Sequence, residues 1–449
     1  MRYLPQTAES RRDMLSRVGV GGIDDLFQDV PSDLRNPEFP TLSDHLGELA
    51  VERRLADYAA QSVSPAEVPS FLGCGTYRHH IPATVDHLIQ RSEYLTAYTP
   101  YQPEISQGTL QTLFEFQTQV AMITGMEVAN ASMYDGATAT AEAVLMAHRV
   151  AKKKTRTVVS GNLNPHYADT TRTMLRYTDF ELAFGDATPA GDEDLLSLVD
   201  DNTAAVVVQN PDVFGRVRDL TPLADELHQR GVLLIVSVTE ALSLGLVASP
   251  GEMGADIVVG EGQSIGVATS FGGPHVGLFA CRQKFVRQMP GRLAGETVDQ
   301  DGRRGYVLTL NAREQHIRRE KATSNICTNA GLCSLAFSIH MSLLGEAGFT
   351  GLAEVNHRAA SAVADRLAAI DGVELQTDAF FNEFTVKLNR PAAPVADQLA
   401  REGVLAGIPA SRLYGEGAGV DDLLILAVTE LNTEDDVATL EAALQEVLA

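Results

Sequence analysis

Short apolar runs alternate with helical stretches from about residue 71 onward. The apolar runs are TVVS, AAVVVQ, VLLIVSV, DIVVG and VGLFAC, which begin at residues 157, 204, 232, 256 and 276. Helical spacing of apolar residues fills the intervals at 108–124, 136–150, 166–175 and 220–230. Strands without a polar face are typical of a mostly parallel sheet that helices cover on both sides. The pattern predicts an α/β fold with a large domain over residues 71–327.

The two ends of the chain have different patterns. Residues 1–70 have helical spacing, with Thr7 as a helix N-cap, and predict a helical N-terminal arm. Near the other end, helices are expected at about 328–345, 352–370 and 433–448, with the strand-like runs VELQTD, EFTVKL and LLILAVTE between the last two. These elements predict a smaller C-terminal α/β domain over residues 328–449. Before this domain, the DG turn in ETVDQDGRRGYVLTL predicts a β-hairpin.

The charge balance narrows the class of partner. The chain has 59 Asp and Glu against 35 Lys and Arg, a formal net charge of -24. This argues against nucleic acid or an anionic membrane as the main partner. Only six of the cationic residues are lysine. Excess carboxylate with little lysine favours a halophile-like surface adapted to high salt, and the alternative is a merely acidic protein.

The sequence lacks the features of a signal peptide, a membrane span and a cysteine-based metal site. The start MRYLPQTAESRRDML has no apolar centre of a signal peptide, and no stretch approaches the roughly 20 apolar residues of a membrane span. We therefore expect a cytoplasmic protein. The four cysteines form no CxxC pair, so we expect four buried thiols and no metal site.

The run YDGATATAEAVLMA from Tyr134 is a candidate anion site. Small residues precede a good helix former run, so free backbone N–H groups and the positive end of the helix dipole would face a cofactor phosphate. An ordinary capped helix start has the same pattern, and both interpretations stay open.

Gln263 lies at a position where some enzymes of this layout have a catalytic lysine. It follows the strand DIVVG and precedes the glycine-rich run SIGVATSFGGPHVG, where an enzyme of this layout that uses pyridoxal phosphate (PLP) would offer the Schiff-base lysine. An amide forms no imine, so we predict no catalytic residue on this chain and a reaction that requires a partner.

Two further residues complete the predicted vestigial pocket. His166 follows a strand at the edge where open α/β sheets bind ligands, as a stacking imidazole or a surface histidine. Glu240 follows the next-but-one strand, either facing a pyridinium nitrogen or serving as a helix-start carboxylate. Lys321 is the alternative Schiff-base lysine, but its polar neighbours Arg318, Arg319 and Glu320 favour a structural or phosphate-contacting role.

Several motifs are specific to one family. They are TPYQPEISQGTLQTLFEFQTQVAMITGMEVANAS from Thr99, GGPH at 272–275, the run from Met289 through REKATSNICTNAGL, and FFNEFTVKL from Phe380. Over essentially its whole length the chain resembles the amino-terminal half of the glycine decarboxylase P-protein, which some organisms split into two subunits. The resemblance implies the aspartate-aminotransferase architecture of fold type I PLP enzymes, with the cofactor lysine in the second half.

The resemblance implies a reaction and its partners. A second subunit, in a heterodimer or a dimer of heterodimers, would bind PLP covalently. The complex would decarboxylate glycine and pass the aminomethyl group to the lipoyl arm of the H-protein, alongside the T-protein and lipoamide dehydrogenase. Alternatives are a non-catalytic scaffold or regulatory subunit, or an independent PLP enzyme that uses Lys321.

Two loops are the expected contributions of this chain to a shared site. Donors near the partner's cofactor phosphate are expected at Thr323, Ser324 and Asn325. The other shared-site loop comprises Tyr101, Gln102, Glu104, Ser106 and Gln107. The alternative is that both loops only pack at the subunit interface.

The charge excess leads to a first prediction. Melting temperature should rise as salt increases from low to molar concentration, because screening shortens the Debye length from about 30 Å to about 3 Å and weakens self-repulsion. Thermal unfolding in a potassium chloride series measures this. A melting temperature that is flat or falls over that range would refute adaptation to high salt.

Overall fold

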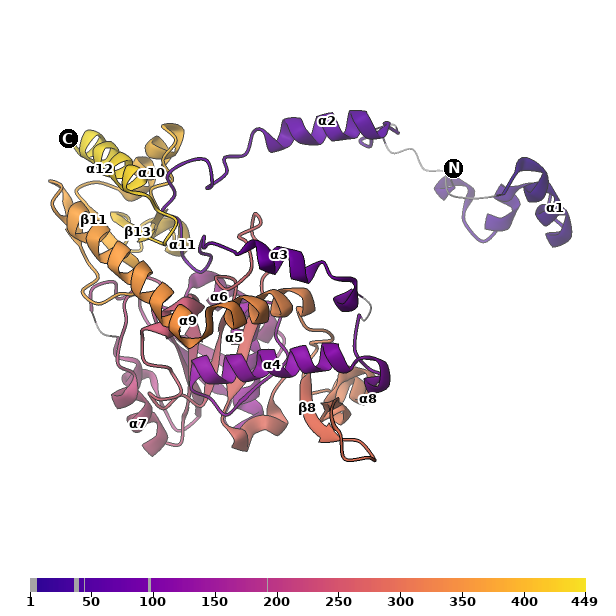
Figure 1. The fold of residues 1–449 in the computed structure, drawn as a ribbon, viewed down its shortest axis with the longest axis horizontal. Coiled ribbons are helices and arrows are strands. Elements are labelled where there is room, and N and C mark those ends of the chain that lie inside the picture. The colour runs from indigo at the N-terminus through magenta and orange to yellow at the C-terminus, as the bar shows by residue number, and fades with distance from the viewer. Residues whose placement is uncertain (1–5, 36–39, 44, 96–97, 192) are drawn as a thin grey trace. The chain divides into compact units, whose positions relative to one another are not determined.

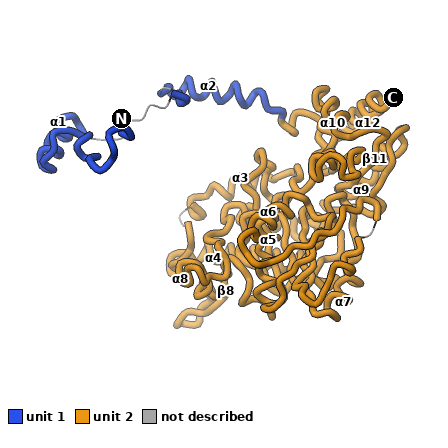
Figure 2. The backbone as a smooth tube through the Cα atoms, turned by 180° about the vertical axis from the view of Figure 1, so that it is seen from behind, with its two compact units in different colours: residues 1–63 blue, residues 64–449 orange. Residues whose placement is uncertain are grey.

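The computed structural model describes all residues except 1–5, 36–39, 44, 96–97 and 192. Its contacts divide the chain into two units, residues 1–63 and residues 64–449 (Figure 2). The larger unit contains all the strands of the described chain (Figure 1). The predicted limits of the arm, large domain and small domain stay a prediction.

The first unit is helical. It contains α1 (Ala8–Val18) and α2 (Glu48–Ala59), and neither helix has a buried residue. The predicted N-cap is confirmed, since the Thr7 hydroxyl accepts a hydrogen bond from the N–H of Ser10 at 3.1 Å. Gly19 ends α1 in the left-handed conformation, which glycine adopts without strain.

The large sheet of the second unit has seven strands in the order β1-β7-β6-β5-β4-β2-β3. Strands β3, β2, β4, β5 and β6 run parallel, while β7 pairs antiparallel with both β6 and β1. The strands are β1 (Val128–Ala129), β2 (Arg156–Val159), β3 (Glu181–Phe184), β4 (Thr203–Gln209), β5 (Leu233–Val238), β6 (Ile257–Glu261) and β7 (Gly277–Cys281). The mostly parallel sheet is as predicted.

Both faces of this sheet are covered, which explains why its strands lack a polar face. Along β4, Val206 and Val208 belong to one core and Ala205 and Val207 to another, because successive side chains point to opposite faces. The first core includes α4 (Gln107–Thr124), α7 (Thr221–Gln229) and α9 (Gly331–Ala368); the second includes α5 (Gly136–Val150) and α6 (Pro165–Leu175).

The small sheet is antiparallel and has the order β10-β11-β13-β12. Its elements are β10 (Val373–Leu375), β11 (Glu383–Leu388), β12 (Ile408–Pro409), β13 (Leu423–Ala427), α10 (Ala392–Arg401), α11 (Ser411–Tyr414) and α12 (Glu434–Leu448). They surround a separate core that includes Phe71 from the start of the second unit. The predicted C-terminal helix corresponds to α12.

The two helices expected at 328–345 and 352–370 form one element, α9. Gly345, the predicted end of the first helix, has φ 59° and ψ -173° and breaks the helical geometry inside α9, so the expected pair of helices is confirmed, although no loop separates them. Before and just after the break, Phe337 and Phe349 pack in the first core of the large sheet. Later in the helix, Ala360 and Leu367 pack in the core of the small sheet, so α9 links the two sheets.

Helix α9 also bears on the expected lack of long apolar stretches. Among the described residues it alone is long and apolar enough to cross a membrane by length and composition, with a mean hydropathy of 1.3 over its best window. The expectation overlooked it because small residues dilute the apolar run. Of its buried residues, Cys333, Phe337, Phe349 and Ala353 pack in the first core of the large sheet, and Ala360, Val363, Ala364 and Leu367 pack in the core of the small sheet.

The expected hairpin is present as β8 (Leu293–Val298) and β9 (Arg304–Thr309). The α-helices of the described chain not yet named are α3 (Ala83–Ile89), which precedes the large sheet in the sequence, and α8 (Gln315–Arg318), which follows the hairpin. All four cysteines are free thiols. Cys281 and Cys333 are buried as expected, but Cys74 is partly exposed and Cys327 is exposed, because Cys327 lies in the polar loop before α9.

Candidate functional site

The parallel strands open a crevice where their carboxyl ends meet, and the chain fills it with its own residues. We call residues Phe71–His80 the crevice segment. Asn164, the N-cap of α6 after β2, donates from Nδ2 to the carbonyl of Cys74 at 3.0 Å. Gln263, two residues beyond β6, binds the backbone of Tyr77. The edge of the sheet that commonly binds ligands in such folds is thus covered from within.

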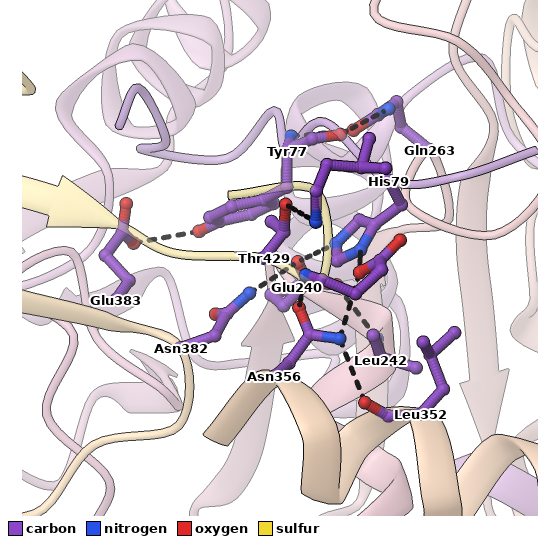
Figure 3. Close-up of polar contacts among 12 residues, drawn as sticks. Tyr77, His79, Glu240, Leu242, Gln263, Leu352, Asn356, Asn382, Glu383 and Thr429 are labelled. Atoms are coloured by element: carbon purple, nitrogen blue, oxygen red, sulfur yellow. Dashed lines mark hydrogen bonds and ion pairs between the residues drawn. The ribbon is translucent and has the colours of Figure 1, made fainter. Parts of the chain in front are cut away.

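Every polar atom of the Gln263 side chain is engaged. Oε1 accepts from the N–H of Tyr77 at 2.9 Å, while Nε2 donates to the carbonyls of Tyr77 and Val267, both at 2.9 Å (Figure 3). Gln263 is only 1% exposed. The amide therefore holds the crevice segment against the sheet, at the position where the sequence led us to expect a missing lysine.

Glu383, the first residue of β11, holds the same segment from the small sheet. Its carboxyl group accepts from the N–H of Cys74 at 2.5 Å and pairs with the hydroxyl of Tyr77 at 2.8 Å. Burial raises the pKa of Glu383 to about 8, above the opposing effect of these hydrogen bonds. Tyr77 is therefore bonded through its backbone to one sheet and through its side chain to the other.

His79 lies between two carboxylates (Figure 3). Its Nε2 is 3.0 Å from Oε2 of Glu240, and its Nδ1 is 2.9 Å from Oε2 of Glu430. Burial alone would lower the pKa of His79, but the two carboxylates raise it to about 10. Glu430 also accepts from Asn356 of α9 at 3.0 Å, and His79 lowers its pKa to about 2 against the effect of burial. A buried imidazolium thus joins β5, α9 and the small sheet.

The N-terminus of α5 meets a further carboxyl group. Oε2 of Glu261 accepts from the N–H of Gly136 at 3.0 Å, and Oε1 accepts from the N–H groups of Gln263 and Val276, both at 3.0 Å. Burial raises the pKa of Glu261 to about 8, against the opposing effect of these backbone donors.

These residues do not fit PLP. Gln263 has no amine for an imine, Glu261 takes the donors at the helix start, and the crevice segment covers the strand ends. Among the described residues, no group of three His, Cys, Asp or Glu side chains is placed to hold a metal ion.

The two loops expected at a shared site lie close to each other. The Tyr101 ring is edge-on to His316 with centroids 5.8 Å apart, and its hydroxyl accepts from Nη2 of Arg292 at 3.1 Å. A cavity of about 440 Å³ nearby is lined by Tyr98 and Pro100, which precede the Tyr101 loop, and by Thr328 and Asn329, which follow Thr323–Asn325, together with residues of α4 and α9.

The whole chain matches one protein family. The family model described as glycine cleavage system P-protein covers residues 1–444. The chain belongs to this family. It is 62% identical over 448 residues to the probable glycine dehydrogenase (decarboxylating) subunit 1 of Xanthobacter autotrophicus, and 61% identical over 449 residues to that of Parvibaculum lavamentivorans, with both chains fully covered in each comparison.

Solved structures agree with the sequence family and confirm the predicted fold. A crystal structure of an inhibitor-bound glycine decarboxylase (P-protein) of the glycine cleavage system matches with a TM-score of 0.90 and 42% identity over all of both chains. A sphingosine-1-phosphate lyase from Burkholderia pseudomallei matches with a TM-score of 0.65 and 13% identity over 93% of this chain and 94% of the other. The fold is that of fold type I PLP enzymes.

Within this P-protein-family fold, two of the three vestigial-pocket residues meet the crevice segment. Gln263 binds Tyr77, and Glu240 binds His79. Glu240 also caps the helical turn η6 (Ala241–Gly245) through the N–H of Leu242, which fits its interpretation as a helix-start carboxylate. His166 is exposed at the start of α6, with its N–H bonded to Asn164.

The residues of the Tyr101 loop divide by exposure. Tyr101, Gln102 and Glu104 are exposed, whereas Ser106 is buried at the start of α4. Gln107 pairs with the backbone of Tyr306 in both directions, at 2.9 and 2.8 Å, and ties α4 to β9.

In the loop before α9, the Ser324 side chain is bonded within the chain. The Ser324 hydroxyl donates to Oε1 of Glu142 in α5 at 2.7 Å, while the N–H of Thr323 donates to the carbonyl of Arg313. Asn325 and Lys321 are exposed. The contact of Thr323, Ser324 and Asn325 with a partner's cofactor stays a prediction.

Sequence reasoning missed the residues that fill the crevice. Tyr77 and His79 come from GCGTYRHHIP, which has no strand or helix period. Glu383 lies within the quoted motif FFNEFTVKL, whereas Glu261 lies between DIVVG and Gln263 and was not singled out; a carboxylate beside an apolar stretch was the available signal.

The environment of His79 leads to a second prediction. Its raised pKa means that the stabilisation is complete below the unfolded value of 6.5 and is lost as pH rises toward about 10. The free energy of unfolding should fall by about 3 kcal/mol between about pH 7 and pH 10 through this group alone.

The matched variant is His79→Gln, which keeps hydrogen-bonding atoms without the charge. Urea unfolding of both proteins across this pH range gives the contribution of His79 as a difference, because Glu261 and Glu383 titrate near pH 8 in both. Parallel losses of stability in the two proteins would rule out a charged His79 in the native state.

Proposed function

We propose that this chain is subunit 1 of a two-subunit glycine dehydrogenase (decarboxylating) of the glycine cleavage system. The observation that carries the proposal is full-length similarity to proteins of that name, combined with an amide at the expected lysine position. A second P-protein subunit would bind PLP covalently, in a heterodimer or a dimer of heterodimers. Glycine would lose carbon dioxide there, and its aminomethyl group would pass to the lipoyl arm of the H-protein.

PLP, when bound in the partner, supplies the electron sink for decarboxylation. The role we assign to this chain is to bind that subunit and to line part of the shared site with the Tyr101 loop and the loop before α9. Support comes from one cavity that is lined by residues next to both loops, Pro100 and Thr328, and from the exposed polar groups of the loops themselves. The T-protein and lipoamide dehydrogenase would complete the system, and we propose a cytoplasmic location.

A third prediction tests the division of labour. The isolated chain should neither form a borohydride-reducible adduct with PLP nor release carbon dioxide from glycine, because Gln263 has no amine. Co-expression with a second-half P-protein subunit should give a complex that does both. Gln263→Lys alone should not restore activity, since the crevice segment still covers the strand ends.

Two results would contradict this division. A reducible adduct on the wild-type single chain would support an independent PLP enzyme, with Lys321 as the first residue to test. Appreciable turnover by the Gln263→Lys chain without a partner would contradict our account of a filled crevice.

A fourth prediction concerns the loop before α9. Thr323→Val with Asn325→Ala should weaken retention of PLP by the reconstituted complex roughly 10-fold or more, since a hydrogen bond to a charged group contributes about 1.5–3 kcal/mol. The subunits should stay associated, because an interface has many contacts. Equilibrium dialysis of PLP and sedimentation measure the two effects.

The matched control is Asn389→Ala, an exposed asparagine beyond β11 at the end of the small sheet. Ser324→Ala is a second comparison, since it removes a bond to Glu142 within the chain. If the loop variant retains PLP and glycine turnover like the control, the loop only packs, and the scaffold alternative gains support.

A further inference from the structure

The start of α5 has the sequence of an anion site, and a group of the same chain already fills it. Asp135 is the N-cap of α5, and its Oδ1 accepts from the N–H of Thr138 at 2.7 Å. The N–H of Gly136, at the first helical position, points instead to Oε2 of Glu261 at 3.0 Å. The carboxyl group therefore takes the position at which a helix start would bind a phosphate.

The other carboxyl oxygen of Glu261, Oε1, is also hydrogen-bonded to backbone N–H groups. It accepts the N–H of Gln263 and the N–H of Val276, which begins the approach to β7. Glu261 is 2% exposed, so its carboxyl group has left water for three backbone donors. Such a donor set around two oxygens of one group is what a bound phosphate or carboxylate receives in an anion site.

The packing around the carboxyl group leaves no gap for a second anion. A Cβ added at Gly136 would lie 2.3 Å from the Tyr167 hydroxyl and 3.0 Å from the backbone of both Gly260 and Glu261. Glycine is therefore required at the helix start, because α5 rests directly on the end of β6. With the Glu261 side chain in place, a phosphate there would need the helix to move away from the sheet.

A second closure lies two residues further along the chain. Gln263 donates its own N–H to Glu261 and clamps the peptide of Tyr77 with its side chain. Nδ1 of His275, from the GGPH motif, is 3.8 Å from Oε2 of Glu261, which encloses the carboxyl group from the side of the glycine-rich loop. Residues 261 and 263 thus close adjacent parts of one crevice.

We propose that Glu261 is the internal ligand of the α5 anion site and the specificity-determining residue that excludes a cofactor phosphate from this subunit. Loss of the Schiff-base lysine removes covalent attachment, but a phosphate monoester can still bind through its charge alone. Glu261 removes that possibility as well. The statement that PLP then resides only in the partner rests on the proposed function; the exclusion itself is a property of the single chain.

The test uses the full-length chain with Glu261→Ala and inorganic phosphate as the probe. The variant frees three N–H groups, so phosphate at about a hundredfold above its dissociation constant should raise its melting temperature by about 3 °C beyond chloride of equal ionic strength. Wild-type protein and Glu261→Gln, whose side chain still fills the position, should respond to phosphate and chloride equally.

Glu383→Ala is the matched control. Glu383 is also buried, has a pKa raised to a similar value and accepts a backbone N–H, but it lies in the small sheet away from α5. This variant should lose stability without a specific response to phosphate. A phosphate response of the same size in Glu383→Ala would show that the effect is general and would overturn the proposal.

Loss of folding does not prevent the test. One outcome is that Glu261→Ala is unfolded in chloride. In that case, cooperative unfolding that returns in phosphate supports the proposal, and a variant that stays unfolded in phosphate overturns it. A folded variant that responds equally to the two salts overturns it too, as does saturable phosphate binding by the wild type. None of these outcomes alters glycine decarboxylation by the wild-type reconstituted complex, so the proposed function is tested separately.

Discussion

The pairing of the Gln263 side chain with the peptide of Tyr77 determines what this chain can do. The amide is complementary to a backbone peptide, since it offers one acceptor and one donor at the same spacing. A lysine at this position would offer donors only and would leave the N–H of Tyr77 unpaired in a buried place. Gln263, which stands where we expect a missing lysine, is therefore also the residue that holds the crevice segment.

The crevice segment in turn explains the density of buried carboxyl groups. Glu240, Glu383 and Glu430 each bind a residue of this ten-residue stretch. Buried carboxyl groups are costly unless they are paired, and here each has a histidine, a tyrosine hydroxyl or backbone N–H groups as partner. The polar network lies at the carboxyl ends of the parallel strands, where open α/β folds commonly bind ligands, and it joins the two sheets.

The sequence predicted the large sheet well because burial on both faces produces long apolar runs, and all five runs became strands. It predicted Gln263 as the site of lost chemistry because strand order and the following glycines place that residue. It did not predict Tyr77 or His79, whose partners are more than 150 residues away and whose segment has no period. Of the three residues predicted for the vestigial pocket, Glu240 and Gln263 contact the crevice segment, and His166 does not. The sequence could not separate them, because an exposed first turn of a helix and a buried one have the same sequence pattern.

Helix α9 gives the chain a fixed internal spacing. Its first half packs on the large sheet and its last turns on the small one, and Asn356 between them binds Glu430. One residue inserted between Phe349 and Asn356, in the continuous helix beyond the break at Gly345, would turn everything after it by about 100° and advance it by about 1.5 Å. Glu430 and Glu383 would then be carried away from His79 and Tyr77. We therefore expect an insertion in this helix to destabilise the fold, whereas the exposed glycine-rich turn at 415–419 should tolerate one.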